Sequence, residues 1–135
     1  KTTSYAENVV ALARAQAAGA DEAIFAKTAG DLCEGTGSNV FVVHDGRLLT
    51  PPLSSGCLAG ITRELVVEEV EIEVEERSLP LDALARADEA FLPSSTRDLV
   101  PIARVDGRPL PRAPGPVTAA CAEAFTALAA RDLDP

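Results

Sequence analysis

The sequence lacks methionine and tryptophan, and it has one histidine and only 4% aromatic residues among its 135 positions. Because His44 is the one histidine, no His/Cys ligand set for zinc can be assembled, and we expect no metal site. The three cysteines are an odd number without CxxC spacing, which favours a reducing, cytoplasmic setting over a disulfide framework. Since there is no initiator methionine and the chain begins with Lys1, we expect a piece of a longer protein.

Basic residues are also scarce, with 12 Lys and Arg against 21 Asp and Glu, and the net charge is −9. Binding to nucleic acid needs clustered basic side chains that contact phosphates, so nucleic acid is not expected as a partner. Long apolar runs are absent because charged residues interrupt them, and no segment is expected to span a membrane. A chain of 135 residues can bury one good core, which predicts a single domain.

What is present is a series of short segments with helical or strand-like hydrophobic periodicity. The helical patterns predict helices over residues 8–18, 62–70, 81–87 and 117–130. Buried or alternating patterns predict strands over residues 22–26, 32–33, 39–43, 47–50, 71–78, 89–92 and 99–105. Turns are predicted where Gly46 and Gly107 follow aspartates. This mixture indicates an α/β fold with a mixed, curled or barrel-like sheet and helices outside it.

The most informative segment is LCEGTGSNVFVVHDG, residues 32–46, which LAGITR follows at residues 58–63. The first segment places Glu34 between apolar residues and a Gly/Ser loop, residues 35–38. This glutamate is either a solvated strand end or a buried carboxylate, and a buried carboxylate needs polar partners. The glycine turn of the second segment is predicted to open a helix with Thr62 as its N-cap. Such a turn is either an ordinary helix start or an anion site built from backbone N–H groups.

A hydroxyl-rich segment, FLPSSTRDLVPI, covers residues 91–102. Ser94, Ser95 and Thr96 form either an ordinary polar turn or a second group of ligands for an anion. Arg97 is either a surface arginine paired with the aspartate that follows it or a ligand for a substrate carboxylate. The residues alone leave both pairs of alternatives open.

In this order, and with Lys1 upstream, the motifs resemble the cofactor-binding half of pyridoxal 5'-phosphate (PLP) enzymes of the class IV aminotransferase family (fold type IV). That family includes branched-chain aminotransferases, D-amino-acid aminotransferases and 4-amino-4-deoxychorismate lyases. The resemblance covers nearly the whole chain and implies that residues 1–135 are the C-terminal, PLP-binding domain of a longer enzyme. It also implies a small amine or amino-acid substrate, an N-terminal domain of the same protein, and a homodimer.

The resemblance assigns roles to individual residues. Lys1 is expected to form the Schiff base with the cofactor and to move the substrate's proton. Glu34 is expected to pair with the pyridinium nitrogen and so keep the ring electron-accepting. The other expected cofactor contacts are Leu58 against the ring, the Ile61 amide, Thr62 and Ser95 at the phosphate, and Ser94 in support. Thr96 and Arg97 are the expected substrate-binding residues.

Within the family, the KTTSYAEN start and the SSTRD segment look most like bacterial lyases. We therefore expect the enzyme to convert 4-amino-4-deoxychorismate into 4-aminobenzoate and pyruvate, in folate synthesis. One alternative is an aminotransferase for branched-chain or D-amino acids that uses the same residues. Another is a scaffold domain that keeps the fold without binding a cofactor. The chain alone is expected to be inactive, because much of the substrate pocket would come from the rest of the protein.

Overall fold

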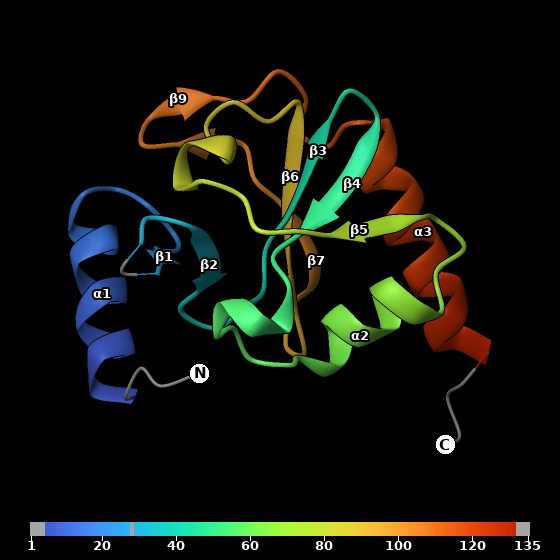
Figure 1. Cartoon of the computed structure of the whole chain (residues 1–135), viewed down its shortest axis with the longest axis horizontal. Helices are drawn as coiled ribbons and strands as arrows, with labels where there is room; N and C mark the ends of the chain where they lie inside the picture. Colours follow the sequence, from blue (N-terminus) through green and yellow to red (C-terminus); the bar gives the residue numbers. More distant parts are fainter. Residues whose placement is uncertain (1–4, 28, 132–135) are drawn as a thin grey trace.

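The computed structural model describes residues 5–27 and 29–131 of the chain (Figure 1). The α-helices are α1 (Tyr5–Ala17), α2 (Ile61–Glu68) and α3 (Pro116–Arg131), and the short 3-10 helices are η1 (Leu53–Ser55) and η2 (Leu81–Ala83). The first five strands are β1 (Ile24–Ala26), β2 (Leu32–Gly35), β3 (Phe41–His44), β4 (Arg47–Thr50) and β5 (Val74–Glu76). The remaining strands are β6 (Glu89–Ser94), β7 (Asp98–Pro101), β8 (Arg104–Val105) and β9 (Arg108–Pro109).

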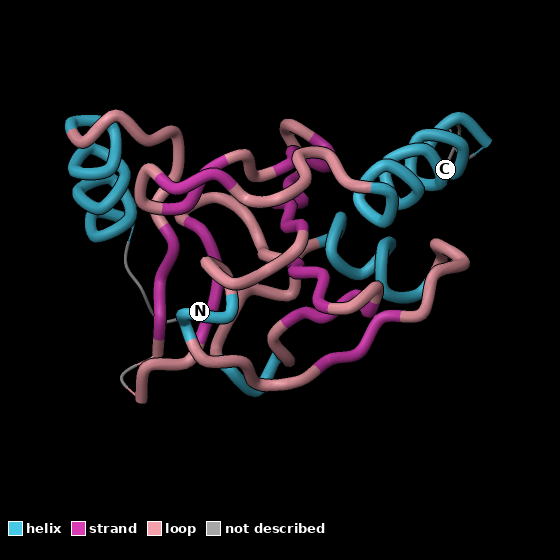
Figure 2. The backbone as a smooth tube through the Cα atoms, turned by 90° about the horizontal axis from the view of Figure 1, so that it is seen from above, coloured by secondary structure: helices cyan, strands magenta, loops and turns pink. Residues whose placement is uncertain are grey.

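The central element is a mixed, five-stranded sheet with the strand order β5-β4-β3-β6-β7. Only β5 runs parallel to its neighbour, and the other pairs are antiparallel. Strands β1 and β2 form one small sheet and β8 and β9 another. Helix α1 lies beside β1 and β2 at one end of the molecule, whereas α2 and α3 lie at the other end (Figures 1 and 2). None of the described helices is both long and apolar enough to cross a bilayer.

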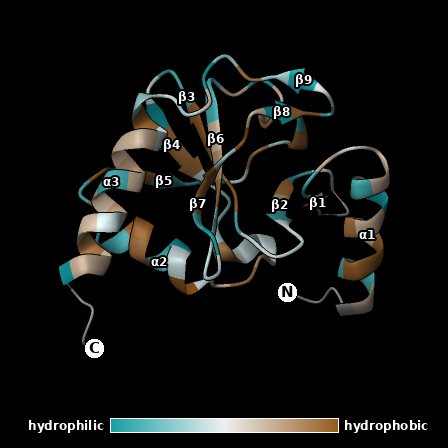
Figure 3. Ribbon diagram, turned by 180° about the vertical axis from the view of Figure 1, so that it is seen from behind, coloured by the Kyte–Doolittle hydropathy of each residue, from teal (hydrophilic) through white to brown (hydrophobic). Residues whose placement is uncertain are grey.

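The sheet separates two hydrophobic clusters, because successive side chains of a strand point to opposite faces. In β3, Phe41 and Val43 pack with residues of α2 and α3, and Phe41 stacks on Phe91 with ring centroids 5.0 Å apart. Val40 and Val42 instead pack toward β2, η2 and the segment that follows it. Figure 3 shows the hydrophobic strands of this sheet beside α2 and α3. Both faces are covered, which explains why β3 is almost continuously apolar.

The predicted α/β fold with a mixed sheet and outer helices is confirmed by this arrangement. Among the described residues the sheet does not close into a barrel, because β5 and β7 remain edge strands. Both predicted Asp-Gly turns are present. Asp45 and Gly46 have φ values of 51° and 77°, and Asp106 and Gly107 have φ values of 49° and 80°. Positive φ at both central residues is the geometry of the tight hairpin turn that suits twisted strands.

Several predicted boundaries were wrong. The helix expected at 81–87 is a single 3-10 turn, because Asp88 already donates its N–H to the Val43 carbonyl at the start of β6. The strand expected at 99–105 is divided, because residues 104–105 leave the central sheet and pair with β9. The strand expected at 71–78 extends only over β5. Helix α2 begins one residue earlier than predicted, so Gly60, not Thr62, is its N-cap.

Candidate functional site

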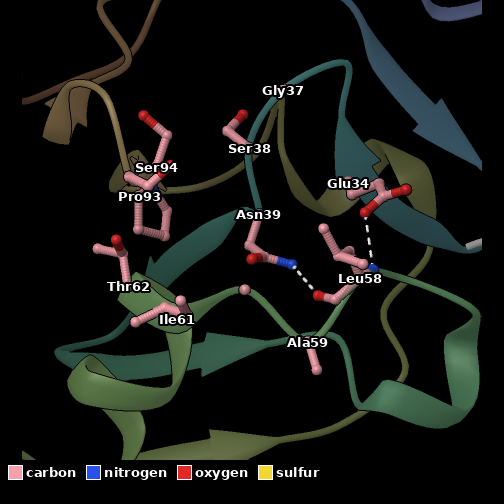
Figure 4. A pocket seen from close by; sticks show the side chains of 12 residues that line it. Glu34, Gly37, Ser38, Asn39, Leu58, Ala59, Ile61, Thr62, Pro93 and Ser94 are labelled. Carbon is pink, nitrogen blue, oxygen red and sulfur yellow. Dashed lines mark hydrogen bonds between the residues drawn. The ribbon is translucent and has the colours of Figure 1, made fainter. Parts of the chain in front are cut away.

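A pocket of about 390 Å³ lies between the loop after β2, the loop before α2 and the end of β6 (Figure 4). It brings together segments that are far apart in the sequence. The lining residues are Glu34, Gly37, Ser38, Asn39, Leu58, Ala59, Gly60, Ile61, Thr62, Pro93, Ser94 and Ser95. All six residues expected to bind the cofactor are among them. Lys1, the expected catalytic residue, lies outside the described residues.

Glu34 forms one side of the pocket. It lies on β2, opposite Phe25 of β1, and only 3% of its surface is exposed, so it is not a solvated strand end. The backbone N–H of Leu58 donates a hydrogen bond of 2.9 Å to its Oε1 atom. A buried carboxylate is costly unless it has such donors, so this contact both stabilises Glu34 and orients it toward the pocket.

Helix α2 forms the opposite side (Figure 4). Its N-cap, Gly60, provides no side-chain cap, and no acceptor for the N–H groups of Ile61 and Thr62 is found in the described part of the chain. The first N–H groups of a helix have no partner within it, and together with the helix dipole they attract an anion. The Thr62 side chain is buried at this point, whereas the side chains of Leu58 and Ile61 are exposed.

Within the described ranges, no lysine or arginine lines the pocket. The nearest candidate by sequence, Arg63, is 3% exposed and points into the protein. Its Nη2 atom donates to the Pro51 carbonyl at 3.0 Å and forms an ion pair of 2.6 Å with Glu76. An anion in this pocket would therefore be bound by backbone N–H groups and hydroxyl groups, with no basic side chain from the described residues.

The hydroxyl residues 94–96 lie at the end of β6 and in the tight turn that leads to β7. Ser94 is buried at the end of β6, and its Oγ atom accepts the N–H of Arg97 at 3.1 Å. Ser94 and Ser95 line the pocket, but Thr96 and Arg97 do not. The Arg97 guanidinium forms an ion pair of 3.7 Å with Glu22, not with the aspartate that follows it. The Arg97 side chain, which was expected to bind the substrate, is thus directed to the Glu22 carboxylate of the protein itself.

Glu22 is a residue that the sequence did not single out. Its carboxylate accepts the Thr36 N–H at 3.2 Å and the Ser38 hydroxyl at 3.2 Å, and it also contacts the Thr36 hydroxyl. These contacts fix the Gly/Ser loop that forms one wall of the pocket. No local signal could have revealed them, because Glu22 precedes the loop by more than a dozen positions.

Asn39 is a second residue to which the sequence analysis gave no role. It is 6% exposed, its Nδ2 atom donates to the Leu58 carbonyl at 2.8 Å, and its backbone N–H donates to the Pro93 carbonyl at 3.2 Å. One residue therefore ties together the three chain segments that surround the pocket. The signal in the sequence was a polar amide directly before a strongly apolar strand, where a buried amide must find partners.

The three cysteines are free thiols. Burial and, second, the neighbouring Glu34 carboxylate raise the pKa of the Cys33 thiol. Burial and, second, Glu89 raise the pKa of Cys121 to about 11. Because the thiolate is the nucleophilic form, these two residues are poor nucleophiles at neutral pH. No cluster of His, Cys, Asp or Glu suited to a metal occurs among the described residues.

Comparison with known proteins gives a consistent result. A family model described as Amino-transferase class IV matches residues 1–105. The branched-chain-amino-acid aminotransferase of Escherichia coli is 36% identical over 129 residues, which are 93% of this chain and 42% of that protein. The PLP-form structure of the branched-chain amino acid aminotransferase from Thermobaculum terrenum matches with a TM-score of 0.88 and 37% identity, over 96% of this chain and 44% of that chain. The structure of the Thermoproteus uzoniensis enzyme with norvaline has a TM-score of 0.84 and 41% identity, over 90% and 41% of the two chains.

This chain spans less than half the length of these three relatives. All three are named branched-chain aminotransferases, and none is named a lyase. The comparisons therefore favour the aminotransferase alternative over the lyase that the KTTSYAEN start and the SSTRD segment suggested. Of the SSTRD segment, which spans the end of β6 and the turn to β7, only Ser94 and Ser95 line the pocket.

Proposed function

This chain belongs to the class IV aminotransferase family, and from that premise we propose that its pocket binds PLP for the transfer of amino groups from amino acids to 2-oxo acids. The observation that carries the proposal is that one pocket has a buried carboxylate on one side and an open helix N-terminus on the other. These are the two groups that a pyridine ring nitrogen and a phosphate require.

The residues present fit PLP. The phosphate end would be held by the N–H groups of Ile61 and Thr62 and by the hydroxyl groups of Thr62 and Ser95. The exposed Leu58 side chain would pack against a face of the ring. Ser94, whose Oγ atom accepts a backbone N–H of the same turn, would keep Ser95 in place.

When bound, PLP supplies an electron sink for the electrons of a substrate Cα–H bond. The Glu34 carboxylate would hold the proton on the ring nitrogen, and the Leu58 N–H would keep that carboxylate in position. Lys1 remains our choice for the lysine that binds the cofactor and then moves the proton at the substrate Cα. This ability to hold a cofactor at both ends is the reason to prefer an enzyme over a scaffold domain.

We further propose that residues 1–135 form the C-terminal, cofactor-binding domain of a homodimeric enzyme. The relatives' greater length is consistent with an additional domain. Such a domain would provide the basic side chain for the phosphate that the described pocket residues lack, and most of the contacts with the substrate side chain. The relatives' names make branched-chain amino acids the first substrates to test.

The proposal is tested with the intact protein and added PLP, in separate assays with leucine plus 2-oxoglutarate and with 4-amino-4-deoxychorismate. We expect glutamate to form in the first assay. Formation of 4-aminobenzoate and pyruvate without glutamate would replace the aminotransferase with the lyase. If the intact protein neither changes the visible spectrum of PLP nor binds it in equilibrium dialysis, the scaffold alternative replaces both.

A further inference from the structure

We propose that Asn39 is a positioning residue that holds Glu34 and the N-terminus of α2 in a fixed relation to each other across the pocket. The proposal rests on the function proposed above, in which these two groups bind opposite ends of PLP. Asn39 reaches both of them through one short segment, residues 58–60 (Figure 4).

The first link runs through Leu58. The Asn39 Nδ2 atom donates to the Leu58 carbonyl at 2.8 Å, and the Leu58 N–H donates to Glu34 Oε1 at 2.9 Å. The carbonyl and the N–H of Leu58 are therefore each held by a hydrogen bond, one to Asn39 and the other to Glu34. If the Asn39 amide is removed, the Leu58 carbonyl keeps only the Gly60 N–H as a donor, at 2.9 Å, and residues 58–60 lose one of the hydrogen bonds that hold them beside Glu34.

The second link runs through Gly60. A Cβ atom at this position would lie only 2.4 Å from Asn39 Oδ1. The backbone of Gly60 has φ −67° and ψ 143°, which any residue can adopt. Glycine is thus required here for contact with the Asn39 side chain and not for its own conformation. Because Gly60 is the N-cap of α2, this contact fixes where the N–H groups of Ile61 and Thr62 lie.

The third link is a backbone hydrogen bond that holds Asn39 itself in place. Its backbone N–H donates to the Pro93 carbonyl on β6 at 3.2 Å, next to Ser94 and Ser95. Asn39 is 6% exposed, so its side chain is packed in place. Asn39 is therefore connected to three parts of the pocket: to Glu34 through Leu58, to the start of α2 through Gly60, and to the end of β6 through Pro93. A residue that only lined the pocket would not need contacts both to residues 58–60 and to β6.

The experiment is a double-mutant cycle in the intact protein with Asn39→Ala, Gly60→Ala and the double variant. Two properties are measured: the dissociation constant of PLP, and the visible circular dichroism of bound PLP, which reports the orientation of the ring. Thr50→Val is the matched control, because the Thr50 hydroxyl donates to the Val40 carbonyl at 2.7 Å, is equally buried and does not line the pocket.

We expect Asn39→Ala to weaken PLP binding about tenfold, the usual effect of losing one hydrogen bond, and Gly60→Ala to weaken it by a similar factor because its Cβ atom displaces Asn39 Oδ1. Both should change the circular dichroism band. The double variant should bind PLP no more weakly than Asn39→Ala alone, because the Cβ added at position 60 has nothing to displace once Asn39 Oδ1 is gone. Thr50→Val should lower the unfolding temperature without changing either property. Gly60→Ala tests the contact from its other side, so the proposal can still be tested if Asn39→Ala does not fold.

The proposal is overturned if the single variants bind PLP as well as the unmodified protein does, with an unchanged circular dichroism band. It is equally overturned if the two losses add in the double variant, or if Thr50→Val changes the band as much as Asn39→Ala. Failure of the proposed function gives a different result, because the unmodified protein itself would then bind no PLP.

Discussion

Helices α2 and α3 pack against the same face of the sheet, but their N-termini are used in different ways. Each helix follows a glycine whose place has no room for a Cβ atom, Gly60 before α2 and Gly115 before α3. At α3 the space is occupied by the Glu89 carboxylate, which accepts the N–H groups of Val117 at 3.2 Å and Thr118 at 2.8 Å. At α2 the neighbour is a neutral amide, and the helix start faces the pocket.

The difference shows how one physical property gives either stability or a binding site. The partial positive charge of a helix N-terminus needs an anion or other acceptors nearby. The protein supplies its own anion at α3 and supplies none at α2 within the described residues. The two buried glutamates therefore differ in kind: Glu89 completes a helix, whereas Glu34 lies at the edge of a space that a ligand can enter.

The largest effect that would distinguish the two glutamates is expected from Glu34→Gln in the intact protein. Glutamine keeps an oxygen that can accept the Leu58 N–H, so the pocket should keep its shape and bind PLP. The charge proposed to hold the proton of the ring nitrogen is lost, and turnover should fall about 100-fold or more, the scale seen when one catalytic electrostatic contact is removed. Steady-state amino transfer is the measurement. Turnover within twofold of the unmodified protein would contradict the role proposed for Glu34.

The reciprocal change is Glu89→Ala, which should affect stability and not binding. It leaves the N–H groups of Val117 and Thr118 without their acceptor inside the protein. We expect the free energy of unfolding to fall by about 2–4 kcal/mol, because two buried donors lose their partner. Urea denaturation checks this result. The dissociation constant of PLP should stay unchanged under folding conditions, and a large loss of PLP affinity would remove the distinction between the two helices.

Features encoded locally were the ones that the sequence predicted well. Short buried apolar runs predicted the central strands, and the two Asp-Gly pairs predicted turns because few other residues adopt positive φ at both positions. The segments around Glu34 and Thr62 predicted two sides of one pocket, and the structure places them there. The roles of these residues toward a cofactor remain predictions.

Features that depend on distant contacts could not be predicted. Asn39 contacts Leu58, Glu22 contacts the Gly/Ser loop and Glu89 caps α3, and each pair is far apart in the sequence. A hydrogen bond between distant residues leaves no periodic pattern in either segment. The comparisons support the aminotransferase alternative better than the lyase, and the sequence could not rank the two because most of the contacts with the substrate side chain are expected from the rest of the protein.

The comparison between helix starts can be sharpened with one threonine from each. Thr62→Val removes a hydroxyl group that lines the pocket, and we expect PLP binding to weaken about five- to tenfold. Thr118→Val is the matched control, because the Thr118 hydroxyl is buried without a partner among the described residues. The control should bind PLP normally and be slightly more stable, since an unsatisfied buried hydroxyl is removed. Equal losses of affinity in both variants would indicate a general packing effect.

The smallest expected effect is on the reactivity of a thiol. Cys33 lies near Glu34 and is expected to respond, whereas Cys121 lies near Glu89 and serves as the control. Because burial and then the Glu34 charge raise the pKa of Cys33, Glu34→Gln should lower that pKa and increase the thiolate fraction at mildly alkaline pH. Labelling of Cys33 by a thiol reagent, followed by mass spectrometry, should become a few-fold faster. Cys121 is fully buried beside Glu89, so its slow labelling should not change in this variant. If both thiols react faster, Glu34→Gln has loosened the whole domain. The faster labelling of Cys33 would then not report the removal of the Glu34 charge, and the proposed difference between Glu34 and Glu89 would lose this support.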